Sequence, residues 1–337
     1  MSVKELRRDV GLIANIWRRR PFNVLIQVSN RCNMRCSFCQ FWSNGVHPDR
    51  ELGLDDFVSL EAQLAEMGRF IISIEGGEPL IRPDIIDIVR VFSARHSTLL
   101  YTNGWYITPE KAASLFAAGV AQVGVSIDFP DAQRHDAKRG LEGAWSRAWS
   151  AVELLRDSAP HGAKQVHVMT VFMEETRRGL EALLEQSASR GVGHHITLLA
   201  TEGTRRDAAG GQWPSAPVAE ELLRLWRAYP HFRSFEDYLR LMDPFLEKSA
   251  MPTCRAGAQS FNIDHLGNVA PCIEKIGAPF GNFRDEPLAE IHKRMVAAEP
   301  AGACQECWTL CRGMGQLLGE GGSWRAWRDF STRMRAT

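Results

Sequence analysis

Short apolar runs alternate with stretches of helical spacing between residues 22 and 200. Several runs are continuously apolar, as strands of a parallel sheet covered by helices should be. The predicted strands are 22–29, 70–75, 97–102, 121–128, 165–172 and 195–200. The predicted helices are 55–68, 83–95, 109–118, 143–158 and 176–190. This alternation predicts an α/β fold with right-handed crossovers. Six units are too few for a full eight-stranded barrel, so we expect a partial (βα)6 TIM-like barrel.

The pattern changes on either side of this region. Residues 1–21 are basic and apolar and predict a helical extension, and residues 201–250 predict a linker or lid followed by helices near 217–229 and 234–248. Residues 251–337 predict a small C-terminal domain, with a β-hairpin turning at 266–268, a helix near 287–298 and a C-terminal helix. The Gly- and Pro-containing stretch from Glu202 to Trp213 follows the last strand, so Glu202 and Arg205 are candidates to face a substrate.

Composition and charge limit the partners and the cellular compartment that we expect. The 40 basic residues balance 40 acidic ones, which gives no reason to expect a nucleic-acid partner. No apolar run approaches the roughly 20 residues needed to span a bilayer, so integral membrane association is not expected. The N-terminus lacks the continuous apolar segment of a secretory signal, and we therefore predict a cytoplasmic protein. In a reducing cytosol, clustered thiols are more often metal ligands or redox groups than disulfides.

Three cysteines are crowded into the stretch SNRCNMRCSFCQFW, at Cys32, Cys36 and Cys39. Iron–sulfur clusters normally take four cysteines, so a three-cysteine loop leaves a coordination position for an exogenous ligand. Structural zinc needs four protein ligands and fits less well. A third interpretation is a buried stripe at i, i+4 and i+7 of a helix, although Asn30 and Asn33 suit a loop better.

Five more cysteines lie near the C-terminus. Cys254 and Cys272 flank the predicted hairpin in a C-x12-G-x4-C pattern, and the stretch CQECWTLC supplies Cys304, Cys307 and Cys311. A zinc ribbon built from C-x2-C pairs is one interpretation. The distance in sequence between the early and late sets favours two separate metal sites.

The motifs that follow the predicted strands resemble those of the radical S-adenosylmethionine (radical SAM) superfamily. The first set has the C-x3-C-x-aromatic-C form, with Phe38 as the aromatic residue. The stretch IEGGEPL (74–80) resembles the GGEP motif of that family. YTNG (101–104), VSID (125–128) and FPDAQRHDAKRG (129–140) follow in the expected order. The resemblance covers roughly residues 22–200.

This resemblance implies that Cys32, Cys36 and Cys39 are the catalytic cysteines and hold a 4Fe–4S cluster. The open iron would bind the amino and carboxylate groups of S-adenosylmethionine, which answers what fills the fourth position. Arg139 is the candidate partner of the methionine carboxylate, with Lys138 as the alternative. The implied cofactor-binding residues are Phe38 against the adenine, Gly76, Gly77, Glu78 and Pro79 at the methionine amino group, and Asn103, Ser126, Asp128 and Arg139.

The late cysteines resemble the SPASM domain of such enzymes, or its shorter relative, the twitch domain. The stretches CRAGAQSFNIDHLGNVAPCIE and FGNFRDEPLAEI carry this resemblance. It implies one auxiliary 4Fe–4S cluster on Cys254, Cys272, Cys304 and Cys307. Cys311 falls outside that scheme and is kept as a possible ligand, a free thiol or a nearby contact. The full SPASM pattern has seven cysteines, so a second auxiliary cluster is not supported.

The implied activity is reductive cleavage of S-adenosylmethionine to a 5′-deoxyadenosyl radical, which abstracts a hydrogen atom from a substrate. We favour oxidation or rearrangement of a small metabolite of sugar or cyclitol type, because only 21 residues precede the first strand and leave no room for a peptide-recognition domain. The alternatives are a ribosomal-peptide maturase, an enzyme with a lipid-linked substrate and a non-catalytic cluster scaffold. The expected partners are a small-molecule or peptide substrate and an electron donor such as flavodoxin or ferredoxin.

Overall fold

A single sheet runs through the molecule. This computed structural model describes residues 3–160, 162–203, 211–298, 304–319 and 323–334. Within them, nine strands pair in the order β6-β5-β4-β3-β2-β1-β7-β8-β9. The strands are β1 (Asn23–Ser29), β2 (Ile71–Gly76), β3 (Ser97–Thr102), β4 (Gln122–Ser126), β5 (Val166–Phe172), β6 (Gly193–Leu198), β7 (Ser260–Ile263), β8 (Asn268–Ala270) and β9 (Gly281–Asn282).

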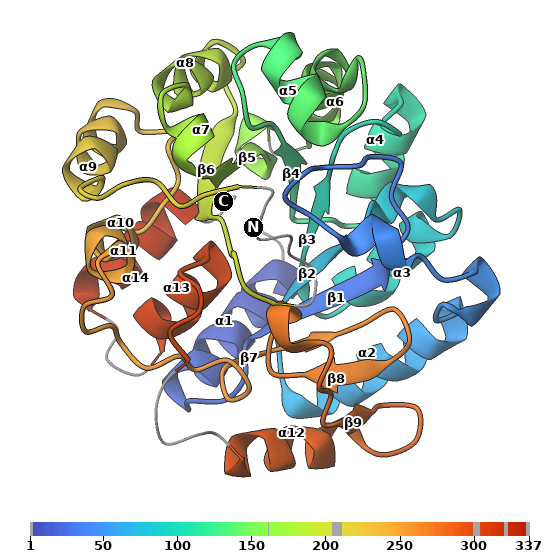
Figure 1. Cartoon of the computed structure of the whole chain (residues 1–337). Coiled ribbons are helices and arrows are strands. Elements are labelled where there is room, and N and C mark those ends of the chain that lie inside the picture. Colours follow the sequence, from blue (N-terminus) through green and yellow to red (C-terminus); the bar gives the residue numbers. More distant parts are fainter. Residues whose placement is uncertain (1–2, 161, 204–210, 299–303, 320–322, 335–337) are drawn as a thin grey trace.

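Neighbouring strands from β1 to β6 are all parallel, which confirms the predicted α/β partial barrel. Helices surround the strands (Figure 1). They are α1 (Val3–Trp17), α2 (Leu54–Met67), α3 (Ile85–Ser93), α4 (Pro109–Ala117), α5 (Ala132–Arg139), α6 (Ala144–Ser158), α7 (Glu174–Arg177), α8 (Leu180–Ser189), α9 (Ala219–Ala228), α10 (Glu236–Arg240), α11 (Met242–Leu246), α12 (Leu288–Ala297), α13 (Leu310–Leu318) and α14 (Trp324–Asp329). Short 3-10 or π segments are η1 (Phe41–Asn44), η2 (Pro48–Arg50), η3 (Pro79–Ile81), η4 (Gly162–Gln165), η5 (Ile273–Lys275) and η6 (Phe330–Met334).

Two predicted helices are each divided in the structure. The helix expected at 176–190 forms α7 and α8, and the break falls at Gly179, where a Cβ would come within 2.8 Å of Pro130 Cδ. The helix expected at 234–248 forms α10 and α11, which meet at Leu241. Pro244 in α11 has no N–H to donate to the preceding turn, so a continuous helix is disfavoured there.

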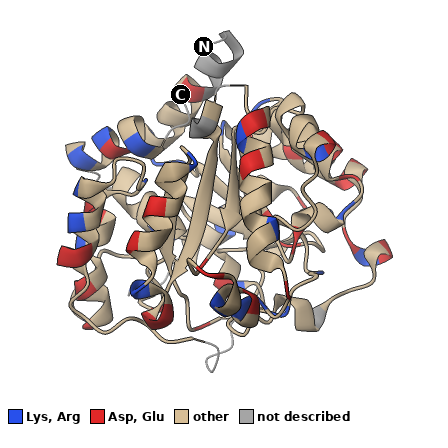
Figure 2. Cartoon of the chain, turned by 90° about the horizontal axis from the view of Figure 1, so that it is seen from above, with Lys and Arg blue, Asp and Glu red and all other residues tan. Residues whose placement is uncertain are grey.

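The strands present one face to the helices and one to the barrel interior. Val24, Ile26 and Val28 alternate along β1 and pack into the main hydrophobic core, since successive strand side chains point to opposite faces. Leu25, between them, lines the interior. Figure 2 shows the charged side chains mainly on the outer helices, around a sheet that carries few of them.

The predicted C-terminal hairpin is present and extends the barrel sheet. β7 pairs antiparallel with β8 and parallel with β1, so this hairpin lies directly against the first barrel strand. Gln27 Nε2 in β1 donates to Asn262 Oδ1 in β7 at 3.2 Å. Helix α13 packs against β6, α10 and α14, on the side where the barrel is open between β6 and β7 (Figure 1). Both late elements therefore form part of the barrel wall.

The helical N-terminal extension packs against the barrel. Leu12 and Ile16 of α1 are buried in the same cluster as Ile71, at the start of β2. Gln122 Nε2, at the start of β4, donates to the Met334 carbonyl at 3.0 Å. α1 and η6 therefore cover the end of the barrel at which the strands begin. In the described residues, no helix is long and apolar enough to cross a bilayer.

Candidate functional site

A cavity of about 350 Å³ occupies the barrel interior. It reaches from the loop after β1 down to α1 and η6. It is lined by the predicted site residues Cys32, Cys36, Phe38, Cys39, Gly76, Gly77, Asn103, Ser126 and Arg139. Segments far apart in the sequence therefore meet at the carboxyl ends of the strands, where such folds place their chemistry.

The loop that carries the first cysteines is fixed by the end of α5. The described residues 30–40 form no helix, which rules out the helical-stripe interpretation. Arg35 N donates to the Arg139 carbonyl at 3.1 Å, and Ser37 N donates to the Lys138 carbonyl at 3.1 Å. Gly140 ends α5 with φ 64°, and a Cβ there would come within 2.7 Å of the Arg35 carbonyl oxygen. This glycine therefore permits both the left-handed helix end and the close contact with the loop.

The GGEP motif lies directly on the cysteine loop. Gly77 N donates to the Ser29 carbonyl at 2.8 Å, and Glu78 N donates to the Arg31 carbonyl at 2.9 Å. A Cβ at Gly76, which has φ 144°, would overlap the Ser29 carbonyl oxygen, and one at Gly77 would overlap that of Arg31. The two glycines are therefore needed first of all for the approach of two protein segments.

Glu78 connects this motif to the end of β3. Its side chain is buried and accepts hydrogen bonds from Thr102 Oγ1 at 2.7 Å, Asn103 N at 2.7 Å and Leu80 N at 3.0 Å. Burial raises the pKa of Glu78, and these donors act against the rise. Glu78 and the buried Pro79 thus lie behind the cavity wall, whereas Asn103 lines the cavity and donates from Nδ2 to Asn33 Oδ1 at 2.9 Å.

Arg139 is positioned by Asp128. Arg139 Nε and Nη2 donate to Asp128 Oδ2 at 2.8 and 2.7 Å, while Asp128 Oδ1 accepts from Val171 N at 2.9 Å. Burial acts to lower the pKa of Arg139, but the Asp128 carboxylate outweighs it and the pKa is raised. The guanidinium lies over the Phe38 ring, 5.4 Å from its centroid. The fully buried Asp128 therefore stands behind Arg139, while Ser126 reaches the cavity.

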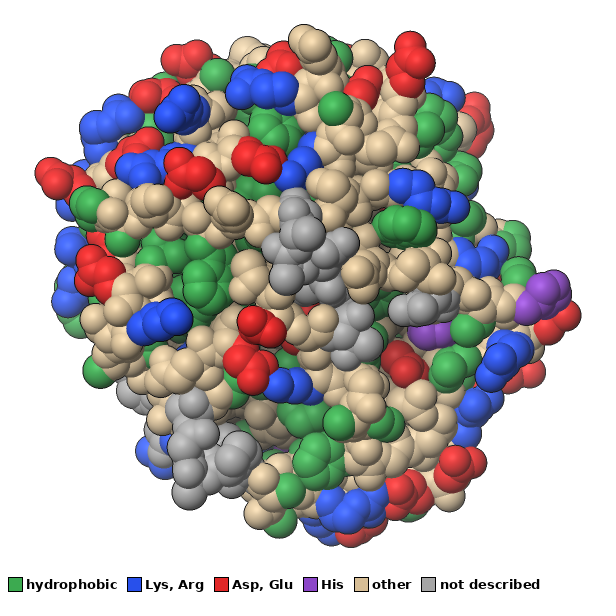
Figure 3. Space-filling model, in the orientation of Figure 1, with side chains coloured by type: hydrophobic (Ala, Val, Ile, Leu, Met, Phe, Trp, Pro, Cys, Tyr) green, Lys and Arg blue, Asp and Glu red, His purple; other side chains and the backbone are tan. Residues whose placement is uncertain are grey.

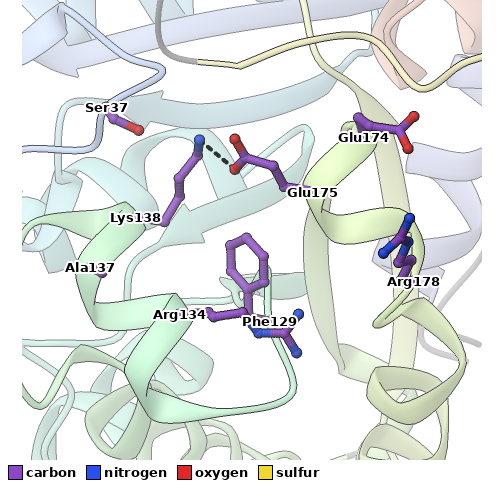
Figure 4. A pocket seen from close by; sticks show the side chains of 8 residues that line it. All are labelled: Ser37, Phe129, Arg134, Ala137, Lys138, Glu174, Glu175 and Arg178. Atoms are coloured by element: carbon purple, nitrogen blue, oxygen red, sulfur yellow. Dashed lines mark ion pairs between the residues drawn. The ribbon is translucent and has the colours of Figure 1, made fainter.

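Lys138, the alternative to Arg139, points elsewhere. Its Nζ lies 2.6 Å from Glu175 Oε2, and Figure 4 shows the two side chains meeting across a groove between α5 and α7. This surface groove of about 630 Å³ borders the cysteine loop at Ser37. It is lined by Ser37, Phe129, Arg134, Ala137, Lys138, Glu174, Glu175 and Arg178. Around it and over the face in Figure 3, acidic and basic side chains are interspersed.

The first three thiols suit an iron–sulfur cluster better than one zinc ion. Burial raises the pKa of Cys32 to about 12 and raises that of Cys36, so bound metal would have to stabilise the thiolates. Structural zinc takes four protein ligands that converge on one ion, whereas the first set supplies three thiols.

The late cysteines come together from distant segments. Cys254, Cys272 and Cys307 are close enough for their charges to interact, and burial raises the pKa of Cys272 to about 12 and of Cys307 to about 11. Lys275 Nζ lies 2.6 Å from Glu306 Oε2, which joins the segment after Cys272 to the segment before Cys307.

Arg312 holds two of these cysteine segments together. Its Nη1 donates to the Cys307 carbonyl, and its Nη2 donates to the Pro252 carbonyl at 3.0 Å. Gln316 Nε2, one helical turn further along α13, donates to the same Pro252 carbonyl at 2.7 Å. The buried end of α13 therefore positions the chain next to both Cys254 and Cys307.

Cys311 faces the barrel cavity. It lies in the first turn of α13, and Asn23 Nδ2 in β1 donates to its Sγ at 3.3 Å. Glu75, Tyr101 and His195 line the same cavity and were missed as site residues in the sequence. Glu75 and Tyr101 lie within recognised motifs at alternate strand positions, which is the signal that could have identified them.

The segment expected to form a lid lies only partly within the described residues. Glu202 is exposed, whereas Arg205 and the rest of 204–210 lie outside the described residues. A Cβ on Gly211 would lie 3.8 Å from Phe38 Cβ, and Trp213 Nε1 donates to the Leu199 carbonyl at 2.8 Å. The described end of this segment therefore runs past the cavity beside Phe38.

Family models match two parts of the chain. The radical SAM superfamily model matches residues 26–186, and an iron–sulfur cluster-binding domain model, SPASM, matches residues 254–312. The chain belongs to the radical SAM superfamily. Membership confirms an enzyme whose cofactors are S-adenosylmethionine with its 4Fe–4S cluster and an auxiliary iron–sulfur cluster.

The relatives of this radical SAM enzyme are named for different reactions. It is 29% identical to the AdoMet-dependent heme synthase of Methanosarcina barkeri, over 80% of this chain and 82% of the relative. It is 28% identical to the mycofactocin maturase MftC of Mycolicibacterium smegmatis, over 87% and 77%. The structure of Streptococcus suis SuiB bound to precursor peptide SuiA superposes with TM-score 0.66 at 15% identity, over 89% and 73%. The last similarity shows a shared fold.

Proposed function

We propose that Cys32, Cys36 and Cys39 hold the cluster that binds S-adenosylmethionine. The observation that carries this assignment is their convergence with Gly77 and Arg139 at one end of a single cavity. The bound cluster supplies the electron that cleaves S-adenosylmethionine to methionine and a 5′-deoxyadenosyl radical. The predicted electron donor is flavodoxin or ferredoxin.

The other residues of this site orient the cofactor and exclude water. Arg139 faces the cavity with its charge held by Asp128, so it is placed to pair with the methionine carboxylate. The Gly76–Gly77 backbone borders the place of the methionine amino group, and Phe38 that of the adenine. Met34, Met173 and Leu199 pack around the cysteine loop and keep solvent from it.

For the auxiliary cluster, we propose the ligands Cys254, Cys272, Cys304 and Cys307. Ile273, next to Cys272, and Thr309 and Leu310, just after Cys307, line the barrel cavity. An auxiliary cluster held by these cysteines would therefore border the place where substrate reacts. It is suited to accept an electron from a substrate radical.

We further propose that the substrate is a peptide of which one side chain enters the barrel. The cavity of about 350 Å³ must also hold part of S-adenosylmethionine, which leaves space for a group of side-chain size. The groove between α5 and α7 borders the same cysteine loop and offers an open path for the rest of an extended chain. The similarity to the mycofactocin maturase and to peptide-bound SuiB also supports a peptide.

A small metabolite is the second candidate. The enclosure of the cavity by α1 and η6 favours it, because a small substrate needs no path beyond the barrel. The relatives named heme synthase show that similar sequences are not restricted to peptides.

Anaerobic reconstitution followed by dithionite and S-adenosylmethionine tests the proposed function. We expect about eight irons per chain, from two four-iron clusters, and formation of 5′-deoxyadenosine. No 5′-deoxyadenosine from fully loaded protein would refute the activity. To separate the substrate classes, transfer of deuterium into 5′-deoxyadenosine should be measured with uniformly deuterated peptides encoded near the gene and with deuterated sugars.

A further inference from the structure

Helix α1, at the end of the barrel opposite the cysteine loop, presents large apolar side chains to solvent. Val10 and Trp17 are 58% and 76% exposed. Two residues separated by two helical turns lie on the same face of a helix, so Val10 and Trp17 share one face. Leu12 and Ile16, on the opposite face, are buried against the barrel. The inner face therefore fixes α1 in place, and the outer face has no cover among the described residues.

Arginines surround this outer face. Arg20 N donates to the Asn15 carbonyl at 2.9 Å, which holds the chain after the helix against its last turn. Asn15 Nδ2 donates to the Arg69 carbonyl at 3.0 Å. A Cβ on Gly11 would lie 2.6 Å from Arg69 Cγ, so this glycine leaves room for the Arg69 side chain to pass over α1 beside Val10. We call Val10, Trp17, Arg18, Arg20 and Arg69 the α1 face.

The cations of the α1 face are not neutralised by the protein. None of Arg18, Arg20 and Arg69 forms an ion pair with a residue that the structure describes. Arg18 and Arg20 are also exposed. The α1 face thus combines a tryptophan in water with positive charges that have no acidic partner within the described chain.

A second exposed tryptophan provides a comparison. Trp324 in α14 is 71% exposed, which is close to the value for Trp17. Its neighbouring arginines are paired, because Arg325 lies 4.0 Å from Asp237 and Arg328 lies 3.2 Å from Glu236. The surface around Trp324 is therefore balanced in charge, whereas the α1 face is cationic.

These features are complementary to the surface of an anionic bilayer. Tryptophan favours the interface between lipid headgroups and acyl chains, and arginines next to anionic lipids add electrostatic attraction. Helices that lie on membranes combine apolar and aromatic side chains with such cations. Cations at a helix C-terminus are favourable in themselves, but that effect does not explain why Trp17 stays exposed. The outer side of a helix is also convex, which suits a flat surface better than a peptide.

We propose that the α1 face docks this enzyme on an anionic phospholipid bilayer. Trp17 and Val10 enter the interface, and Arg18, Arg20 and Arg69 lie against lipid phosphates. Because the cysteine loop is at the other end of the barrel, a docked enzyme keeps its mouth open to substrate. This docking goes beyond the proposed function and does not depend on the class of substrate.

Sedimentation with sucrose-loaded vesicles tests the docking. Reconstituted holoenzyme is mixed with vesicles of phosphatidylcholine, either alone or with about one-third phosphatidylglycerol. We expect at least tenfold tighter binding to the anionic vesicles, weakened by added salt. Trp17→Ala should weaken this binding about tenfold. Replacing Arg18 and Arg20 together by Gln should weaken it about fivefold for each charge removed.

Matched variants control for aromatic area and for net charge. Trp324→Ala removes a tryptophan of similar exposure, and Gln at both Arg224 and Arg240 removes two charges that are paired with acids. Both control proteins should bind vesicles as the parent does. Failure to bind anionic vesicles, equal binding to both kinds of vesicle, or equal weakening in the controls would overturn the proposal. Tighter binding of double-stranded DNA through the same arginines would assign the α1 face to a nucleic acid instead.

Discussion

The two cysteine sets are built in different ways. The first comes from one short loop that is hydrogen-bonded to the end of α5 and lies on the GGEP backbone. The second is assembled from the segment before β7, the turn after β8 and the chain that leads into α13. Long side chains such as Arg312 hold these segments together. The first site is thus a property of the barrel, whereas the second depends on contacts between distant parts of the chain.

This difference predicts that the two sites can be lost separately. The largest effect is expected from replacing Cys32, Cys36 and Cys39 together by Ala, which should abolish formation of 5′-deoxyadenosine and remove about half of the iron. Cys272→Ala should instead remove the auxiliary cluster and leave slow cleavage of S-adenosylmethionine. Iron analysis and chromatography of the products check both variants. Unchanged cleavage in the triple variant would show that the first site is assigned wrongly.

The same difference explains what the sequence could predict. Cys32, Cys36 and Cys39 lie within eight residues of the sequence, so their spacing alone made them candidate metal ligands. The positions of Glu78 and Asp128 could not be inferred in this way. Both belong to motifs that end strands, but their hydrogen bonds to Thr102 and Arg139 turn them behind the cavity wall.

The second prediction concerns the buried ion pair of the first site. Asp128→Asn leaves the Arg139 guanidinium buried without its carboxylate, so the free energy of unfolding should fall by about 3–5 kcal/mol. The affinity for S-adenosylmethionine should fall as well, because Arg139 loses its fixed position. Urea unfolding and equilibrium dialysis measure the two effects.

Glu153→Gln provides the matched control, since it breaks the Arg190–Glu153 ion pair. The Glu153 side chain of this pair is about half-exposed. Exposed pairs contribute about 1 kcal/mol or less. An equal decrease in the free energy of unfolding in Asp128→Asn and Glu153→Gln would mean that the buried ion pair stabilises the first site no more than an exposed pair does.

The third prediction uses pH to test the first site. His135 Nδ1 accepts a hydrogen bond from Asp128 N at 3.2 Å, and burial lowers the pKa of His135 to about 4. Between pH 4 and about 6.5 the unfolded chain therefore binds more protons than the folded one, so this contribution to stability is lost as pH falls through that window. At 1.36 kcal/mol per pKa unit it amounts to about 3 kcal/mol.

His135→Asn keeps an acceptor at this position but has no proton to bind in that window. Other buried histidines, such as His96, also titrate, so the informative quantity is the difference between the two proteins. Urea unfolding of metal-free protein at pH 7 and pH 4 should show a smaller decrease for the variant. An equal decrease in the free energy of unfolding from pH 7 to pH 4 in both proteins would mean that His135 makes no pH-dependent contribution to stability beside Asp128.

The sequence predicted more of the fold than of the arrangement of the late cysteines. Alternating patterns located the six barrel strands and the hairpin, because strand periodicity is local. The pairing of β7 with β1 and the placement of α13 beside β6 are long-range packing results that no local pattern encodes. For that reason, spacing left open whether Cys311 was a ligand, whereas the structure turns it toward Asn23.

The smallest effect is expected when the support of the second site is weakened and all cysteines are kept. Arg312→Met removes the donors to the Cys307 and Pro252 carbonyls but fills a similar volume, so the free energy of unfolding should fall by about 2 kcal/mol. Auxiliary-cluster iron should decrease while 5′-deoxyadenosine formation persists, because the first loop has separate supports. Arg325→Met, at an exposed arginine 4.0 Å from Asp237, should change neither quantity. Electron paramagnetic resonance and iron analysis of the reconstituted variants provide the measurement. A parallel loss of both clusters in Arg312→Met would show that the two sites depend on one another, contrary to their separate construction.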